Sequence, residues 1–368
     1  MPSSLSKKSS DYRFLLYFGI LIIFGLLMLS SAGVAVGMDR FKDPYFFVRR
    51  QLLFGILPGI ILFFVAAKID YHVWKKYAMP IFILGLLFLL LTYIPGIGST
   101  NNTGSQSWIG VAGHSFQPAE AVKLILIIFL SALLAKNAGK LSDFSQGFLP
   151  PLLMGMIPVA LIALQPDIGT AAILFAIILG ILFLAGARWT HIVGLVLVAI
   201  IAFGLMIAAA PYRAHRLTTF LHPELDIQGK GYQINQAFLA VGSGGWFGLG
   251  LGHSRQKFQY LPEVHADSIF AIIAEEMGFI ITTGFIVLLA LLTLQGFKIA
   301  KNAPDQFGSL LCGGIMIWVM VQSLLNIGAI IGLLPLTGVP LMFVSHGGSA
   351  ILIGFVAMGM IVNVSKSR

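Results

Sequence analysis

Ionisable side chains are rare in this sequence, and the densest group of them lies between Tyr260 and Phe270. Within this stretch Glu263, His265 and Asp267 alternate along the chain, and a long apolar run follows. A carboxylate at such a boundary is partly removed from water, which raises its pKa and suits it to act as a general base. We therefore take Asp267 as the candidate catalytic base. The alternative is that an aspartate in front of a helix only caps its first turn.

Three other places put ionisable groups in or beside apolar runs, where they are costly unless they are paired or hydrated. Glu120 and Lys123 stand at i and i+3, on one face of a helix. This spacing fits two alternatives. The first is a local arrangement at the membrane rim, either as an ion pair or with Lys123 extending outward to the surface; the second is the wall of an outward-facing polar cavity that binds a substrate headgroup. Asp167 stands in a short turn, where it binds substrate or caps the next helix. Glu276 and Asp267 cannot face one point from a straight helix, because they lie on opposite sides of it.

Metal and phosphate chemistry is only weakly indicated. A metal site built from Glu263, His265 and Asp267 stays open, although its spacing has low specificity. The single cysteine, Cys312, excludes an intrachain disulfide and a cysteine-based metal site. The glycine-rich run 242–252 lacks the Gly-Lys-Ser/Thr ending of a phosphate-binding loop, and we predict tight turns and a re-entrant segment there.

The composition shows which kind of protein must position these groups. Of 368 residues, 58% are apolar and only 10% are charged. A soluble domain has roughly 25% charged residues, so soluble and disordered proteins are both excluded. The net charge of +9 does not indicate nucleic-acid binding, because basic residues gather in the cytoplasmic loops of membrane proteins.

Continuous apolar runs predict an all-α integral membrane protein with about ten transmembrane helices. The predicted spans are 14–36, 48–67, 78–95, 119–135, 148–164, 168–187, 191–210, 268–294, 307–332 and 341–363. We expect residues 1–368 to form one polytopic membrane domain. Its hydrophilic parts are a tail at 1–13, a loop at 96–118 and the largest loop, 211–267, between spans 7 and 8.

The distribution of basic residues sets the orientation. With the N-terminus inside, thirteen Lys and Arg fall in inner segments and nine in outer ones. Without the loop 211–267, where the rule is weaker, the count is thirteen to four. We therefore predict that both termini are cytoplasmic and that the loop 211–267 is extracytoplasmic. Arg49 and Arg50 are the main exception to this pattern.

Motifs along nearly the whole chain carry a family resemblance. They include Asp43-Pro44-Tyr45, Gln117-Pro118-Ala119-Glu120, Gln165-Pro166-Asp167-Ile168-Gly169, Tyr260-Leu261-Pro262-Glu263, Asn326-Ile327-Gly328 and Phe343-Val344-Ser345. Together these motifs resemble the SEDS family, which comprises FtsW, RodA and SpoVE. The first motif and Gln256-Lys257 look more like FtsW than RodA.

The resemblance implies a peptidoglycan glycosyltransferase that polymerises lipid II into glycan strands for the septal wall. In that reaction Asp267 takes the proton from the acceptor hydroxyl. Lys and Arg side chains bind the leaving pyrophosphate, with a divalent cation (Mg²⁺ or Mn²⁺) as the candidate cofactor at this step. The candidate substrate-binding residues are Glu120, Lys123, Asp167, Arg213, Arg216, Lys257, Glu263 and Glu276. The alternatives are a RodA-like polymerase for elongation, a lipid II flippase and a division scaffold. We weigh the flippase lower, because transporters usually have interrupted spans and here the polar groups gather at the outer end.

The resemblance also implies partners and a location. A class B penicillin-binding transpeptidase and other divisome proteins are the expected partners, and the bacterial cytoplasmic membrane is the expected location. The chain departs from the family pattern at Gln106, Ser107, Ala266, Ser268, Met342 and His346. Contacts made by the family's residues at these positions are therefore not carried over to this chain.

Overall fold

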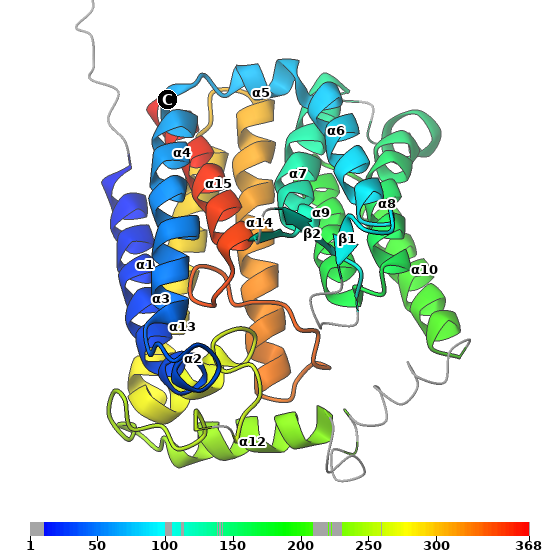
Figure 1. The fold of residues 1–368 in the computed structure, drawn as a ribbon. Coiled ribbons are helices and arrows are strands. Elements are labelled where there is room, and N and C mark those ends of the chain that lie inside the picture. Colours follow the sequence, from blue (N-terminus) through cyan, green and yellow to red (C-terminus); the bar gives the residue numbers. More distant parts are fainter. Residues whose placement is uncertain are drawn as a thin grey trace, which may run out of the picture.

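The protein is a bundle of helices, most of which run between its two ends (Figure 1). The computed structural model describes residues 11–99, 105–111, 114–137, 139, 141, 143–208, 220, 222, 230–258 and 260–367. The helices are α1 (Tyr12–Ala32), α2 (Val34–Phe41), α3 (Phe46–Gln51), α4 (Leu57–Lys68), α5 (His72–Lys76), α6 (Ala78–Leu91), α7 (Pro118–Lys136), α8 (Leu149–Leu164), α9 (Ile168–Leu184), α10 (Trp189–Ala208), α12 (Lys230–Ser243), α13 (Ile269–Lys301), α14 (Gln306–Ile330) and α15 (Gly348–Lys366). The π-helical turn η1 (Leu52–Ile56) joins α3 to α4, and η2 (Phe144–Phe148) leads into α8.

The predicted membrane spans are present. Among the described residues, seven helical stretches are long and apolar enough to cross a bilayer, and α6, α9 and α10 are shorter apolar helices. These ten stretches coincide with the ten predicted spans, apart from shifts at their ends. The prediction of an all-α, multi-pass membrane protein is confirmed.

The two ends of the bundle differ. The start of α1, the end of α15 and the short helix α5 lie at one end, the upper one in Figure 1. The helices α2 and α12 and the start of α13 lie at the opposite end, where α12 runs across the bundle (Figure 1). The described ends of the chain are therefore on the same side, as predicted. By the predicted orientation, the end with α12 is the outer one.

Local sequence signals explain where several helices begin. Asp11, Asp143, Asp167 and Asp305 stand at helix N-termini, and each accepts a hydrogen bond of 2.8–3.2 Å from a backbone N–H of the first turn. Such caps replace partners that the first N–H groups of a helix otherwise lack. Pro118 begins α7, where the missing N–H of proline costs nothing. Much of the sparse acidic charge thus defines helix boundaries.

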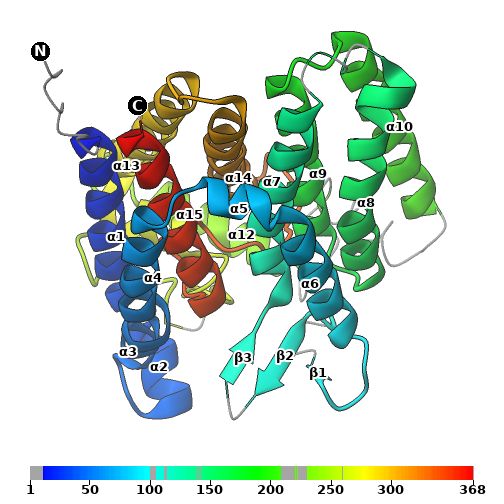
Figure 2. The same cartoon turned by 90° about the horizontal axis from the view of Figure 1, so that it is seen from above.

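The most buried helices form the centre of the bundle. Buried residues make up 78% of the apolar window of α14 and 72% of those of α7 and α15, but only 39% for α1 and 33% for α13. Seen from above (Figure 2), α7 and α14 lie in the middle, with α1 and α4 to one side and α8 and α10 to the other. Most side chains in the middle of α7 and α14 therefore face protein rather than lipid.

The outer loop 96–118 contains a small sheet that the sequence did not predict. Strands β1 (Gly98–Ser99), β2 (Trp108–Val111) and β3 (His114–Phe116) pair antiparallel in that order. Ile109 of β2 lies opposite both Gly98 and Phe116. Strands this short give no periodic pattern that a sequence reading could detect. The sheet begins close to the end of α6 and leads directly into α7.

The eighth span is broken. Gly278, inside α13, has φ 70° and ψ −179°, so the helix Ile269–Met277 ends there and a second helix continues. The glycine-rich run supplies hydrogen bonds at the break: Leu249 and Gly250 donate to the carbonyls of Glu275 and Glu276. The N–H groups of the second helix donate back to the same run. The predicted tight turns are therefore present, and they replace the backbone partners that the break removes.

The tenth predicted span began too early. Residues 331–347 form an irregular segment that returns into the bundle, and helix α15 starts only at Gly348. The apolar residues Leu341, Met342, Phe343 and Val344 are buried, which explains why their run resembled a helix in the sequence. We call residues 331–347 the re-entrant segment; the name does not refer to the glycine-rich run 242–252, for which the sequence also predicted a re-entrant path.

Candidate functional site

Asp267 lies at the outer end of the bundle, directly before α13. The N-cap of α13 is Ser268, whose side chain makes no capping hydrogen bond, so Asp267 precedes the capping position. The Asp267 side chain is half-buried. Its backbone carbonyl accepts a hydrogen bond of 2.7 Å from Nδ2 of Asn326 on α14, and the same Nδ2 donates to the carbonyl of Val339 at 2.8 Å. This geometry fixes the main chain of the candidate base against the re-entrant segment.

Glu120 and Lys123 form the local ion pair that was one of the two alternatives from the sequence. Lys123 Nζ lies 2.8 Å from Glu120 Oε1 and 2.7 Å from Gln322 Oε1, and it sits 5.3 Å from the ring centre of Trp318. Both side chains of the ion pair are almost completely buried. Gln322 in turn donates to the carbonyl of Pro340 at 3.0 Å. The pair thus belongs to a buried network that ends on the re-entrant segment.

Lys257 and Glu276 form a second buried ion pair, at the break in α13. Lys257 Nζ lies 2.8 Å from Glu276 Oε1, and both groups also bond to the hydroxyl of Ser31 on α1. The two side chains are 3% and 0% exposed. The neighbouring Glu275 accepts from the backbone N–H groups of Arg255 and Gln256, so both glutamates fasten the loop in front of α13. A direct contact between substrate and Lys257 or Glu276 would require this cluster to open.

Glu263 and His265 lie near each other, beside aromatic rings. Glu263 is exposed, and its Oε2 lies 3.7 Å from Nε2 of His265. The ring of His265 stacks on Phe47 at 3.9 Å, and His346 meets the same phenylalanine edge-on at 5.2 Å. Burial lowers the pKa of His265 to about 3, with the nearby His346 and Arg40 adding to the effect. Both histidines belong to segments outside the membrane-spanning helices.

The pKa of His346 is lowered in the same way, to about 4, first by burial and then by the charge of Arg50. Both imidazoles are therefore neutral at neutral pH. The two neutral rings pack against Phe47 in an aromatic cluster, and at neutral pH they contribute no positive charge.

The remaining predicted site residues are placed separately. Asp167 accepts a hydrogen bond of 3.0 Å from the N–H of Thr170 and caps α9. Arg213 and Arg216 lie outside the described residues. In the part of the chain that the structure describes, no group of three or more His, Cys, Asp or Glu side chains is arranged to hold a metal ion. The described donors therefore do not form the metal site that the spacing of Glu263, His265 and Asp267 left open.

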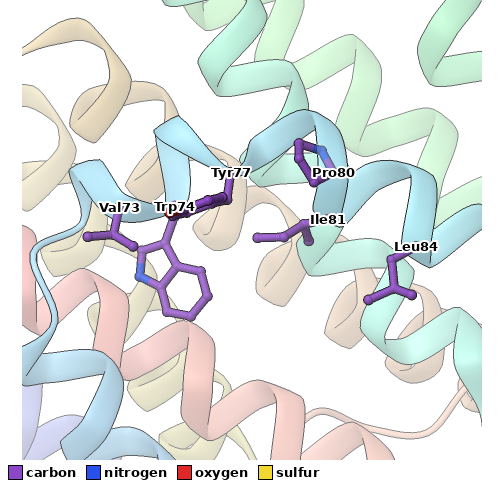
Figure 3. A pocket seen from close by; sticks show the side chains of 6 residues that line it. All are labelled: Val73, Trp74, Tyr77, Pro80, Ile81 and Leu84. Atoms are coloured by element: carbon purple, nitrogen blue, oxygen red, sulfur yellow. The ribbon is translucent and has the colours of Figure 1, made fainter.

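Two recesses lie at opposite ends of the molecule. An open hollow of about 600 Å³ on the outer side has a partly polar lining: Gly252, His253, Ser254, Arg255, Gln256, Phe258 and Tyr260. An apolar recess of about 280 Å³ lies along α5 and α6 and is lined by Val73, Trp74, Tyr77, Pro80, Ile81 and Leu84 (Figure 3). The second recess lies at the inner end, away from Asp267, and none of its lining residues is ionisable except Tyr77.

Several buried polar residues that hold the candidate base or the re-entrant segment were not among the predicted site residues. Gln322 and Asn326 are one helical turn apart on α14, and Ser345 lies on the re-entrant segment; all three are buried. The signal was present, because an amide inside an apolar run is costly unless its hydrogen bonds are satisfied. Asn326 and Ser345 were noted only as parts of family motifs.

The comparisons with known proteins agree along the whole chain. Residues 12–368 match the family model of the cell cycle proteins FtsW, RodA and SpoVE. The chain belongs to the FtsW/RodA/SpoVE family. The resemblance stated from the sequence is thereby confirmed.

Individual members of this family are similar to the chain over most of its length. Stage V sporulation protein E of Bacillus subtilis is 40% identical, with 98% of each chain covered. A probable peptidoglycan glycosyltransferase FtsW of Geobacter sp. strain M18 is 39% identical over 94% of each chain. Among solved structures, a chain of a peptidoglycan synthase complex that coordinates polymerization and crosslinking matches with a TM-score of 0.81 and 25% identity, covering 98% of both chains.

Proposed function

We propose that this chain is a peptidoglycan glycosyltransferase that polymerises lipid II into glycan strands, with Asp267 as the general base. The observation that carries the proposal is the combination of two facts. Family members named as peptidoglycan glycosyltransferases match 94% or more of the chain. In addition, a half-buried carboxylate with a fixed main chain lies at the outer end of the bundle, where a lipid-linked sugar is displayed.

In the proposed reaction, the acceptor sugar hydroxyl attacks the anomeric carbon of the donor. The bond between that carbon and the pyrophosphate oxygen breaks, and its electron pair leaves with the lipid pyrophosphate. The proton of the hydroxyl passes to the Asp267 carboxylate. Because attack and departure occur on opposite faces, the configuration at the anomeric carbon inverts. A positioned base of this kind contributes about 10²- to 10⁴-fold to the rate.

The leaving pyrophosphate requires positive charge close to the reacting carbon. The positive charges of Lys123 and Lys257 are already compensated by the carboxylates of their buried glutamate partners. We therefore assign this role first to Arg213 and Arg216, in the large outer loop, with the exposed Arg255 as a further candidate. Glu263 is exposed, and its backbone carbonyl accepts a hydrogen bond of 3.2 Å from the N–H of Ser268, the residue after the base. Glu263 is therefore the strongest candidate among the acids for a substrate contact.

The biological setting follows from the family. We propose that the protein acts in septal wall synthesis in the bacterial cytoplasmic membrane, together with a class B penicillin-binding transpeptidase and other divisome proteins. The similarity to a chain of a synthase complex that coordinates polymerization and crosslinking supports the transpeptidase as partner. The seven long apolar helices support the membrane location.

One observation favours a second candidate, a lipid II flippase. The apolar runs of the sequence predicted uninterrupted spans, but α13 is interrupted at Gly278 and the re-entrant segment is not helical. Interrupted helices are typical of transporter sites. The break lies near the start of α13, however, and the charged side chain beside it, Glu276, is already paired with Lys257.

A single liposome experiment separates the two functions. Fluorescent lipid II is incubated with the purified protein in liposomes, with and without the transpeptidase, and both glycan length and lipid movement are measured. We expect polymer from the wild type and, from Asp267→Ala, a polymerisation rate lower by about 10²- to 10⁴-fold at an unchanged folded fraction. Movement of lipid II without any polymer would instead assign the protein as a flippase.

A further inference from the structure

We infer that Asn326 and Ser345 are positioning residues for the transfer reaction, because together with the re-entrant segment they hold the main chain of Asp267. The inference rests on the proposed function of Asp267 as the base. In this arrangement the buried ion pair of Glu120 and Lys123 also has a role, because it anchors the re-entrant segment through Gln322.

Three consecutive peptide carbonyls carry the inference. The carbonyl of His265 accepts from the backbone N–H of His346 at 2.8 Å, and that of Ala266 accepts from the Ser345 hydroxyl at 2.5 Å. The carbonyl of Asp267 accepts from Asn326 Nδ2 at 2.7 Å. The segment in front of α13 is therefore held, residue by residue, by groups that lie far away in the sequence.

The same groups also hold the re-entrant segment itself. The Ser345 hydroxyl accepts from the N–H of Leu341 at 2.8 Å, and Asn326 donates to the carbonyl of Val339 at 2.8 Å. Each side chain thus joins the base-carrying segment to the re-entrant segment. A substitution that removes either side chain uncouples the two while leaving the Asp267 carboxylate chemically intact.

The buried ion pair anchors this arrangement from the other side. Gln322 accepts from Lys123 and donates to the carbonyl of Pro340, the residue after Val339. Gln322 and Asn326 therefore bind consecutive carbonyls from adjacent turns of α14. Lys123 also bonds to Glu120, so both members of the pair act on the base-carrying segment through Gln322 and the re-entrant segment.

Position matters because a base acts only within hydrogen-bond distance of the proton that it removes. A displacement of about 1 Å by a substitution away from the chemistry can lower a rate by about 100-fold. Removing Asn326 or Ser345 should therefore lower kcat and leave the KM for lipid II nearly unchanged, because neither residue is required to touch the substrate.

The test compares Asn326→Leu and Ser345→Ala with a matched control, Ser323→Ala. Ser323 is also buried on α14, and its hydroxyl has no hydrogen-bond partner among the described residues. Polymerisation of lipid II is measured with full-length protein in nanodiscs, as kcat and KM per folded molecule. We expect kcat to fall about 10- to 100-fold in both test variants, with KM within twofold of the wild type, and we expect the control to equal the wild type in both quantities.

The outcomes separate the positioning role from the proposed function. Wild-type kcat in Asn326→Leu and Ser345→Ala, measured beside an inactive Asp267→Ala, would overturn the positioning role alone. Wild-type polymerisation by Asp267→Ala would overturn the base assignment on which the inference rests. If Asn326→Leu does not fold, Ser345→Ala removes only one hydroxyl and decides the question by the same readouts. Equal losses in Ser323→Ala would mean that any change in the α14 region lowers the rate, which also overturns the inference.

Discussion

Replacing Lys257 by Met should destabilise the protein strongly. The side chain of Lys257 is 3% exposed, and its ammonium group donates to Glu276, to Ser31 on α1 and to the carbonyl of Gly252. Without Lys257, the carboxylate of Glu276 stays buried and keeps only the hydroxyl of Ser31 and the N–H of Ser254 as described donors. An uncompensated buried charge of this kind costs about 3–5 kcal/mol.

The expected loss is measurable through the single cysteine. Cys312 is fully buried on α14, so a thiol-specific probe reacts with it only when the protein opens. Since a tenfold change corresponds to about 1.4 kcal/mol, Lys257→Met should raise the labelling rate roughly 150- to 5,000-fold. The second variant, Lys257→Met with Glu276→Gln, removes the buried charge and keeps an acceptor for Ser31, so most of the loss should be recovered.

The matched control is Arg49→Met. Arg49 pairs with Asp43 on the surface, where its side chain is 65% exposed, and exposed pairs contribute about 0–1 kcal/mol. We expect less than roughly a sixfold change in labelling for this control. A labelling rate for Lys257→Met that is no higher than that of Arg49→Met would refute the reasoning about the buried pair.

Two further predictions concern stability. The pKa values of His265 and His346 are about 3 and about 4 in the folded protein, below the ordinary value of 6.5. Below pH 6.5 the unfolded chain therefore binds protons that the folded protein does not bind. The free energy of unfolding is highest above pH 6.5 and decreases as the pH falls toward 4 and 3. The thermal midpoint should fall between pH 7 and pH 4.5, and less so in His346→Phe; an equal fall in both proteins would exclude this histidine as a cause. Asp167→Ala should cost about 1 kcal/mol because the N–H of Thr170 loses its acceptor. Asp167→Asn keeps an acceptor and should stay close to wild type, so equal chemical stability of all three proteins would contradict the capping role.

The helical spans were predictable because their signal is local and strong. A continuous apolar run long enough to cross a bilayer identifies a span without any knowledge of its neighbours. The break at Gly278 was not predictable in this way, since a glycine inside an apolar run is tolerated in a helix. Its backbone partners come from the run 242–252, a contact that only the tertiary structure establishes. The apolar residues 341–344 were wrongly predicted to begin a membrane span. They are buried in protein, and burial in protein and burial in lipid require similar side chains.

The candidate site was predictable in its acids but not in their grouping. Sparse charge singled out Asp267, Glu120 and Lys123, and the structure places all three close to the beginning of a helix. The pairing of Lys257 with Glu276 across the broken helix depends on folding of the loop onto α13 and α1. Asn326 was not predicted as a site residue because its neutral amide does not stand out among apolar residues as a charge does. Once buried, however, an amide needs hydrogen-bond partners just as a charged group does.

The most direct test of the account is lipid II polymerisation by purified wild type and Asp267→Ala, each with and without a class B penicillin-binding transpeptidase. The wild type should form glycan strands, and Asp267→Ala should form them at a rate lower by about 10²- to 10⁴-fold, with equal thermal midpoints for the two proteins. Glycan strands formed by folded Asp267→Ala at the wild-type rate would contradict the proposed role of Asp267.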